Sequence, residues 1–140
     1  MTKKKKKQKE ESKKNKKKTT VSQSELDQAA QLLQNNELET AQKRLNKLLK
    51  KSPNHGGALY YLALVHYKKG AYSQAQKYLQ KSIYKLPSST KHDTMGQLLE
   101  KTKDLESAEK HYHLALKYDC NNVKVLNNLG TLLGEQGSLE

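Results

Sequence analysis

From Val21 onward, apolar residues recur at intervals of three and four, the pattern of a helix with one buried face. Gly, Pro and Asn interrupt the pattern, and no segment shows the strict alternation of apolar and polar positions that indicates a half-buried strand. The longest apolar run, Ala58 to Val65, has eight residues, well short of the roughly 20 that a membrane-spanning helix needs. The pattern therefore predicts an all-α body without a transmembrane segment.

The helical pattern repeats along the chain. A shift of 34 residues places Ala41 on Ala75 and Pro53 on Pro87, and a shift of 33 places Ala75 on Ala108. Each period contains two helical segments joined by a short turn and followed by a loop. Because one helix pair cannot cover its own apolar face, successive pairs must stack. We expect units at residues 22–55, 56–89, 90–122 and 123–140, of which the last is incomplete.

Small residues stand at the positions where paired helices must approach closely, with larger residues nearby to fill the remaining space. The positions concerned are Ala63, Ala75, Gly96, Ala108 and Gly130. We expect each of them to lie at a helix–helix contact.

This pattern resembles the tetratricopeptide-repeat family. The unit at 56–89 matches best, through Leu59, Leu62, Ala63, His66, Gly70, Tyr72, Ala75, Leu79, Ser82 and Pro87. The next unit departs from the family, with Lys103 in place of the turn glycine and Cys120 in place of the proline. The resemblance implies a right-handed α-solenoid of antiparallel helix pairs.

In this family the first helix of each unit lines a concave surface, and the resemblance implies which residues face it here. They begin with tyrosines, which bring a large contact area at low rotamer cost, and continue with polar side chains. The implied groove residues are Tyr60, Tyr61, Leu64, Tyr67, Lys68, Thr94, Gln97, Asn127, Asn128 and Thr131. We expect a non-catalytic interaction module that binds a peptide or helix of a partner protein. Alternatively, some of these tyrosines pack between adjacent units.

Two specialised versions of the family have characteristic residues at these positions. The carboxylate clamp that grips chaperone tails is absent, because its places hold Leu26, Ala30, Tyr61, Thr90 and Thr94. The asparagine ladder of O-linked N-acetylglucosamine transferases is matched only by Asn128. The closing segment is nevertheless similar to the repeats of those transferases and of bacterial sulfotransferases. With the incomplete fourth unit, this supports an alternative: the chain is the N-terminal arm of a larger enzyme whose catalytic domain lies beyond residue 140.

Side chains capable of chemistry are few and scattered. His111 and His113 are two residues apart, about 200° around a helix, so they cannot share a metal ion. Cys120 is the single cysteine and has no neighbouring base or cation that would activate its thiol. The glycines from Gly130 to Gly137 do not have the spacing of a phosphate-binding loop. We predict no catalytic residue, metal or cofactor within this chain.

Charge changes the picture mainly at the N-terminus. The chain carries 27 Lys and Arg against 14 Asp and Glu, a net charge of +13. Residues 1–20 hold eleven Lys and two Glu but no Leu, Ile, Val or aromatic residue. Such a segment cannot offset the entropy cost of ordering, so we predict a disordered tail capable of weak, nonspecific contact with nucleic acid or anionic surfaces. No apolar segment follows the lysines, which predicts a cytoplasmic protein, or a nuclear one if the source is eukaryotic.

Overall fold

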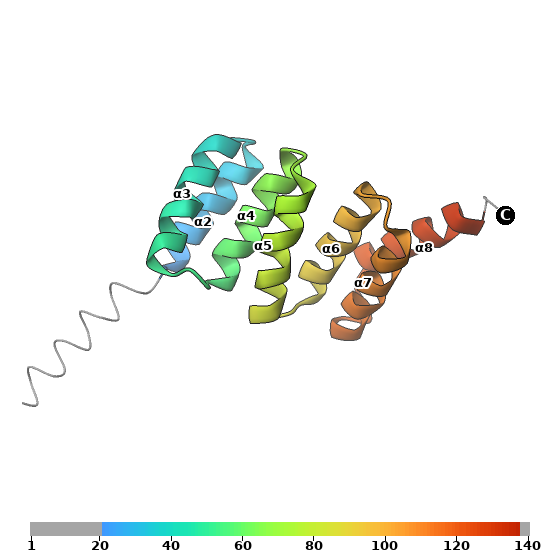
Figure 1. The fold of residues 1–140 in the computed structure, drawn as a ribbon. Helices are drawn as coiled ribbons and strands as arrows, with labels where there is room; N and C mark the ends of the chain where they lie inside the picture. Colours follow the sequence, from blue (N-terminus) through green and yellow to red (C-terminus); the bar gives the residue numbers. More distant parts are fainter. Residues whose placement is uncertain (1–20, 138–140) are drawn as a thin grey trace, which may run out of the picture.

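A computed structural model describes residues 21–137, and within that range the chain forms seven helices and no strand (Figure 1). The helices are α2 (Gln23–Gln34), α3 (Leu38–Lys51), α4 (Gly56–Lys68), α5 (Tyr72–Lys85), α6 (Ser89–Lys101), α7 (Leu105–Tyr118) and α8 (Val123–Gly137). They stack as successive pairs in an all-α solenoid. The disordered tail predicted for residues 1–20 lies outside the described residues.

Five of the helices begin at a side chain that accepts a hydrogen bond from an otherwise unpaired backbone N–H group. Ser22 and Glu25 form a capping box at the start of α2, in which each side chain accepts from the other residue's N–H at 3.2 Å. The side chains of four further residues accept from the first turn at the starts of α4, α6, α7 and α8: His55, Ser88, Asp104 and Asn122. These polar residues therefore set the helix boundaries locally.

The turn inside each of the first three pairs contains one residue in the left-handed backbone region. These residues are Asn36 (φ 59°), Gly70 (φ 78°) and Lys103 (φ 66°). Gly70 adopts this conformation without strain because it has no Cβ, whereas a residue such as Lys103 does so at a cost of about 1–2 kcal/mol. The turn geometry is thus kept where the glycine is replaced.

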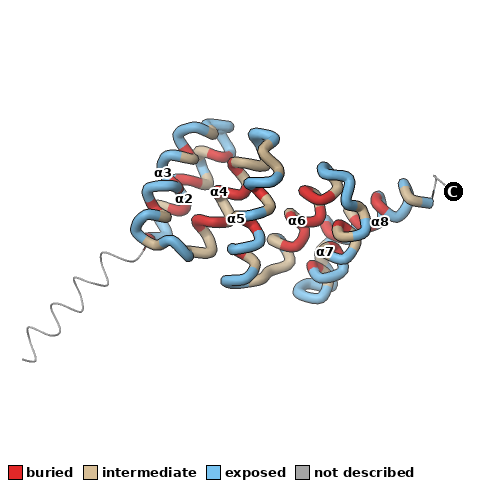
Figure 2. The backbone as a smooth tube through the Cα atoms, viewed as in Figure 1, coloured by how far each residue is buried: buried red, intermediate tan, exposed pale blue. Residues whose placement is uncertain are grey.

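Buried residues occur along the whole array of helices (Figure 2), and most of them are apolar and form the core. One cluster lies among α2, α3 and α4 and includes Leu26, Leu45 and Val65. A second lies among α4 to α8 and includes Leu98 and Tyr112. The half-buried ring of Tyr78 on α5 packs against both clusters and so connects them. No helix in the described range is long and apolar enough to cross a membrane.

The small residues behave as expected at four of the five positions. Ala63, Ala75 and Ala108 are buried, and Gly96 on α6 lies directly against the ring of Tyr112 on α7. The expectation for Gly130 is wrong: this glycine is exposed, and an added Cβ would meet nothing within 4 Å. The physical reason is that none of the described helices packs against that side of α8.

Candidate protein-binding groove

A hollow of about 760 Å³ is lined by residues of α4, α6 and α8, the first helices of their pairs, and by residues at the start of α7. Its volume lies within the range of about 300–1,000 Å³ that is typical of ligand-binding clefts. We call it the groove. Its lining residues are Tyr67, Gln97, Glu100, Lys101, Lys103, Leu105, Asn128, Glu135 and Gln136.

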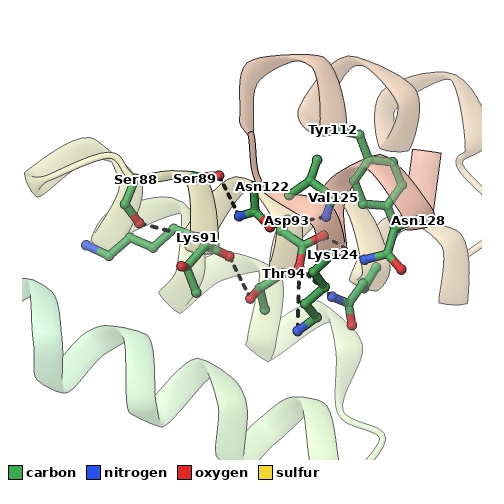
Figure 3. A network of polar contacts seen from close by, with 12 residues as sticks. Ser88, Ser89, Lys91, Asp93, Thr94, Tyr112, Asn122, Lys124, Val125 and Asn128 are labelled. Atoms are coloured by element: carbon green, nitrogen blue, oxygen red, sulfur yellow. Dashed lines mark hydrogen bonds and ion pairs between the residues drawn. The ribbon is translucent and has the colours of Figure 1, made fainter. Parts of the chain in front are cut away.

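Asp93 on α6 is a carboxylate buried beside this groove, with 2% of its surface exposed. One carboxylate oxygen accepts a hydrogen bond from Nε2 of Gln97 at 2.9 Å, and the other accepts from Nδ2 of Asn128 at 2.8 Å. Lys124 Nζ lies 3.6 Å from Asp93 and neutralises its charge (Figure 3). Asp93 therefore links α6 to α8 and meets the requirement that a buried charge be paired and hydrogen-bonded.

This network fixes the orientation of two amide side chains that line the groove. Because Gln97 and Asn128 both direct an N–H toward Asp93, their carbonyl oxygens are turned away from it. Each amide also keeps a second N–H. The groove thus presents oriented acceptors and donors, which is what a peptide backbone requires.

Two tyrosines are held as neutral hydrogen-bonding groups around the groove. Burial, together with the hydrogen bond that Tyr112 Oη donates to Glu100 Oε2 at 2.5 Å, raises the pKa of Tyr112 far above its usual range. Burial also raises the pKa of Tyr67, whose ring contacts Tyr72 edge-on at 5.8 Å. Glu100 is consequently anchored at the groove by Tyr112.

The family model described as anaphase-promoting complex, cyclosome, subunit 3, which is of the tetratricopeptide type, matches residues 34–115, more than half of the chain. The chain belongs to the tetratricopeptide-repeat family. A tetratricopeptide-repeat protein of Methanocaldococcus jannaschii is 33% identical over 91 residues. That match covers 65% of this chain, and the chain spans only 16% of the length of this curated relative.

Solved tetratricopeptide structures share the fold. A mutant of the O-GlcNAc transferase of Thermobaculum terrenum superposes with a TM-score of 0.75 at 19% identity, covering 81% of this chain and 23% of the transferase. The first tetratricopeptide domain of Spaghetti (RPAP3), bound to an HSP90 peptide, gives 0.75 at 16% identity over 85% and 98% of the two chains. YrrB, described as having an unusual peptide-binding site, gives 0.73 at 21% over 91% and 66%. These likenesses show the fold alone, so the transferase-arm alternative stays a prediction.

The structure brings some of the predicted groove residues together on this tetratricopeptide surface. Tyr67, Gln97 and Asn128 line the groove itself. Asn127 and Thr131 lie on the exposed side of α8, where the Thr131 hydroxyl donates to the Asn127 carbonyl at 2.9 Å. Binding at these residues stays a prediction.

The remaining predicted residues lie nearer to the packing between tetratricopeptide units. Tyr60 packs against the second core cluster, which lies among α4 to α8, and its Oη is 3.4 Å from Oγ1 of Thr94. Tyr61 and Leu64 pack against the first core cluster, which lies among α2, α3 and α4. Lys68 Nζ donates to the Leu33 carbonyl at 3.0 Å. Inter-unit packing, the alternative interpretation of the tyrosines, therefore describes Tyr60 and Tyr61.

Several residues that line the groove were not predicted from the sequence. Lys103 and Leu105 belong to the turn and the start of α7, while Glu135 and Gln136 lie near the end of α8. The implied positions came only from first helices, so a turn residue had no signal. The burial of Asp93 was also not predicted, and its signal was a carboxylate among the packing residues of a helix, which needs a partner.

A histidine pair on α6 and α7 was also not predicted. The Nδ1 atoms of His92 and His111 are 3.1 Å apart, and Tyr118 stacks on His92 with ring centroids 5.5 Å apart. Burial lowers the pKa of both histidines, and the positive potential of His92 lowers that of His111 further. One Nδ1 must be unprotonated to accept from the other, so at least one ring of the pair is neutral when this contact is formed. Within residues 21–137, no group of three His, Cys, Asp or Glu side chains could hold a metal ion.

We expect this pair to make the fold sensitive to acid. Because the folded-state pKa values lie below 6.5, the unfolded chain takes up protons first as the pH falls. The contribution of this pair to the free energy of unfolding should be fully present above about pH 6.5 and should decrease below it. The limiting slope is about 1.4 kcal/mol per pH unit for each histidine. Urea unfolding between pH 7.5 and 5, roughly the range in which histidine titrates, measures the slope. His111→Gln should reduce it, whereas His113→Gln, at an exposed position, should not. Equal slopes in both variants would contradict this expectation.

Proposed function

We propose that the chain is a non-catalytic interaction module that binds a peptide or helix of a partner protein in the groove. The observation that carries this proposal is the pair of amides, on Gln97 and Asn128, that buried Asp93 orients at the groove. An extended backbone offers one N–H and one C=O per residue, and a fixed amide can pair with both. Because Asp93 has already ordered these side chains, binding incurs less loss of rotamer entropy.

The groove also offers side-chain contacts to such a partner. Tyr67 and Leu105 supply apolar area, and Glu100, Lys101 and Lys103 supply charge of both signs. The residues of the carboxylate clamp are absent from this chain. We therefore propose recognition of an internal segment of the partner, not of its C-terminal carboxylate.

The comparisons support a binding role at a coarse level. The chain belongs to a family of tetratricopeptide repeats, and two neighbours of similar fold are described as bound to a peptide or as having a peptide-binding site. The peptide binding described for these two neighbours belongs to those proteins. For this chain, the partner class is inferred from the groove residues above.

Selection from a random-peptide phage library on the full chain tests the proposal. The best peptides are then measured against Gln97→Ala/Asn128→Ala and against a matched control, Asn46→Ala/Gln74→Ala, which removes two exposed amides from α3 and α5. Loss of two hydrogen bonds, each contributing about 0.5–1.5 kcal/mol, should weaken binding about 5- to 150-fold in the groove variant only. Peptides that bind both variants equally would show that the groove is not the site.

A further inference from the structure

The surfaces of α3 and α5 that face away from the core carry a concentration of positive charge. The exposed cations are Lys43, Arg44, Lys47, Lys50 and Lys51 on α3, and Lys77, Lys81 and Lys85 on α5. We call this surface the outer basic face. The single acidic side chain on these two helices is Glu39, and it pairs with Lys69 at 2.6 Å.

The repeat places these lysines in matching rows. Lys43, Lys47 and Lys51 are each 34 residues before Lys77, Lys81 and Lys85. Residues four apart lie on the same side of a helix, about 6 Å from one another. Both helices pack on α4 (Figure 1), with buried Leu45 and Leu79 at equivalent inward positions. The two rows therefore point to the same outer side of the solenoid.

Most of this charge is not neutralised within the described chain. Lys51 pairs with Glu25 at 3.7 Å, and Arg44 donates to the amide of Gln28. The other six cations form no ion pair with any residue in the range 21–137. Clustered like charges repel one another. A polyanion that binds here would relieve this repulsion and would also release its own counterions.

An exposed aromatic ring lies within the outer basic face. Tyr84 on α5 is 89% exposed, although a tyrosine ring is largely apolar. Together with Lys81, Lys85 and Leu59, it lines a hollow of about 420 Å³. Cations beside an exposed ring are the combination that holds single strands, because the cations contact phosphates and the ring stacks on a base.

We propose that the outer basic face binds single-stranded nucleic acid, with the lysine rows on successive phosphates and Tyr84 stacked on a base. A flexible strand can follow both rows along the outer side of the solenoid. Lysines and one ring provide no bidentate readout of base edges, so binding is tolerant of sequence. The outer basic face lies on α3 and α5, the second helices of their pairs, whereas the groove is lined mainly by first helices. The two proposals therefore do not depend on each other.

The test uses the full chain and a fluorescein-labelled oligouridine of about 20 nucleotides, a length above the site size of about 4–16 nucleotides common for single-strand binding folds. Fluorescence anisotropy gives affinity at several salt concentrations between about 50 and 200 mM. The variant Lys77→Gln/Lys81→Gln/Lys85→Gln removes the α5 row. The control Lys110→Gln/Lys117→Glu lowers the net charge by the same three units at exposed positions of α7, outside both the outer basic face and the groove. Circular dichroism confirms that both variants are folded, and the lysines of residues 1–20 contribute equally to both.

The α5 variant should lower the slope of log affinity against log salt by about 2, since each phosphate contact on a single strand contributes about 0.7. The control should keep the wild-type slope. Tyr84→Ala should weaken binding roughly 5- to 150-fold without changing the slope. Equal slopes in the two lysine variants would overturn the proposal. The proposal would also be overturned if the α5 variant no longer bound phosphatidylserine vesicles but still bound the oligonucleotide with unchanged affinity. That result would indicate that the outer basic face binds a membrane surface. An unchanged affinity in Tyr84→Ala would overturn the stacking contact.

Discussion

Replacing Gly96 by alanine is expected to lower the free energy of unfolding by about 2–3 kcal/mol, because it overpacks the contact between α6 and α7. The added Cβ would lie 2.5 Å from one ring atom of Tyr112 and 2.8 Å from two others. That ring cannot swing aside easily, since it is fully buried and its hydroxyl is bound to Glu100. The helices would have to move apart, and the adjoining apolar contacts would weaken.

Urea unfolding followed by circular dichroism measures this loss, and Gly130→Ala is the matched control. Gly130 is also a helical glycine, but an added Cβ there meets nothing within 4 Å. Alanine should therefore stabilise α8 by about 0.5–1 kcal/mol through reduced backbone entropy in the unfolded state. The double variant Gly96→Ala/Tyr112→Leu should lose less than the sum of its single variants. If Gly96→Ala were as stable as Gly130→Ala, the close contact would not exist in solution.

Asp93→Ala is expected to cost about 3 kcal/mol of stability, since removing one partner of a buried, hydrogen-bonded charge network is strongly destabilising. The substitution leaves the amides of Gln97 and Asn128 without their acceptor. It also removes the anion that faces Lys124. Because Asp93 joins α6 to α8, the loss should be largest at the C-terminal end of the described array.

Thermal and urea unfolding of Asp93→Ala should be compared with Asp27→Ala. Asp27 is an exposed carboxylate that accepts from Gln23 at 3.0 Å, so its removal should change stability by less than about 0.5 kcal/mol. A double-mutant cycle between Asp93 and Asn128 should give a coupling energy of about 1 kcal/mol or more. A coupling near zero would mean that the network does not hold α8 in place.

The helices and the family could be predicted from the sequence, because both depend on short spacings that repeat. The spacing of Ala41, Ala75 and Ala108 indicated the helix pairs, and the substitution at Lys103 was recognised as the turn position. In the structure these alanines are fully buried, and Lys103 adopts the left-handed conformation of a turn glycine. Local periodicity carries this information because each pair packs on its neighbours in the same way.

The candidate groove was only partly predictable. The first helices were correctly expected to contribute, and Tyr67, Gln97 and Asn128 line the groove. Sequence could not decide how far Tyr60 and Tyr61 pack between units, because that depends on the depth to which each ring enters the neighbouring pair. The Gly130 error has the same origin: a small residue predicts a close approach only where another helix is present.

The sequence by itself thus determined the all-α repeat, the turn positions and the set of polar and aromatic side chains available for binding. Only the tertiary structure brought Asp93 to Asn128, 35 residues away, and His92 to His111, 19 residues away. The reason is physical: helical spacing depends on contacts within one or two turns, whereas these polar pairs exist only after neighbouring units have stacked at a particular depth and angle. Hydrogen bonds between units follow from that stacking, and no local pattern specifies them.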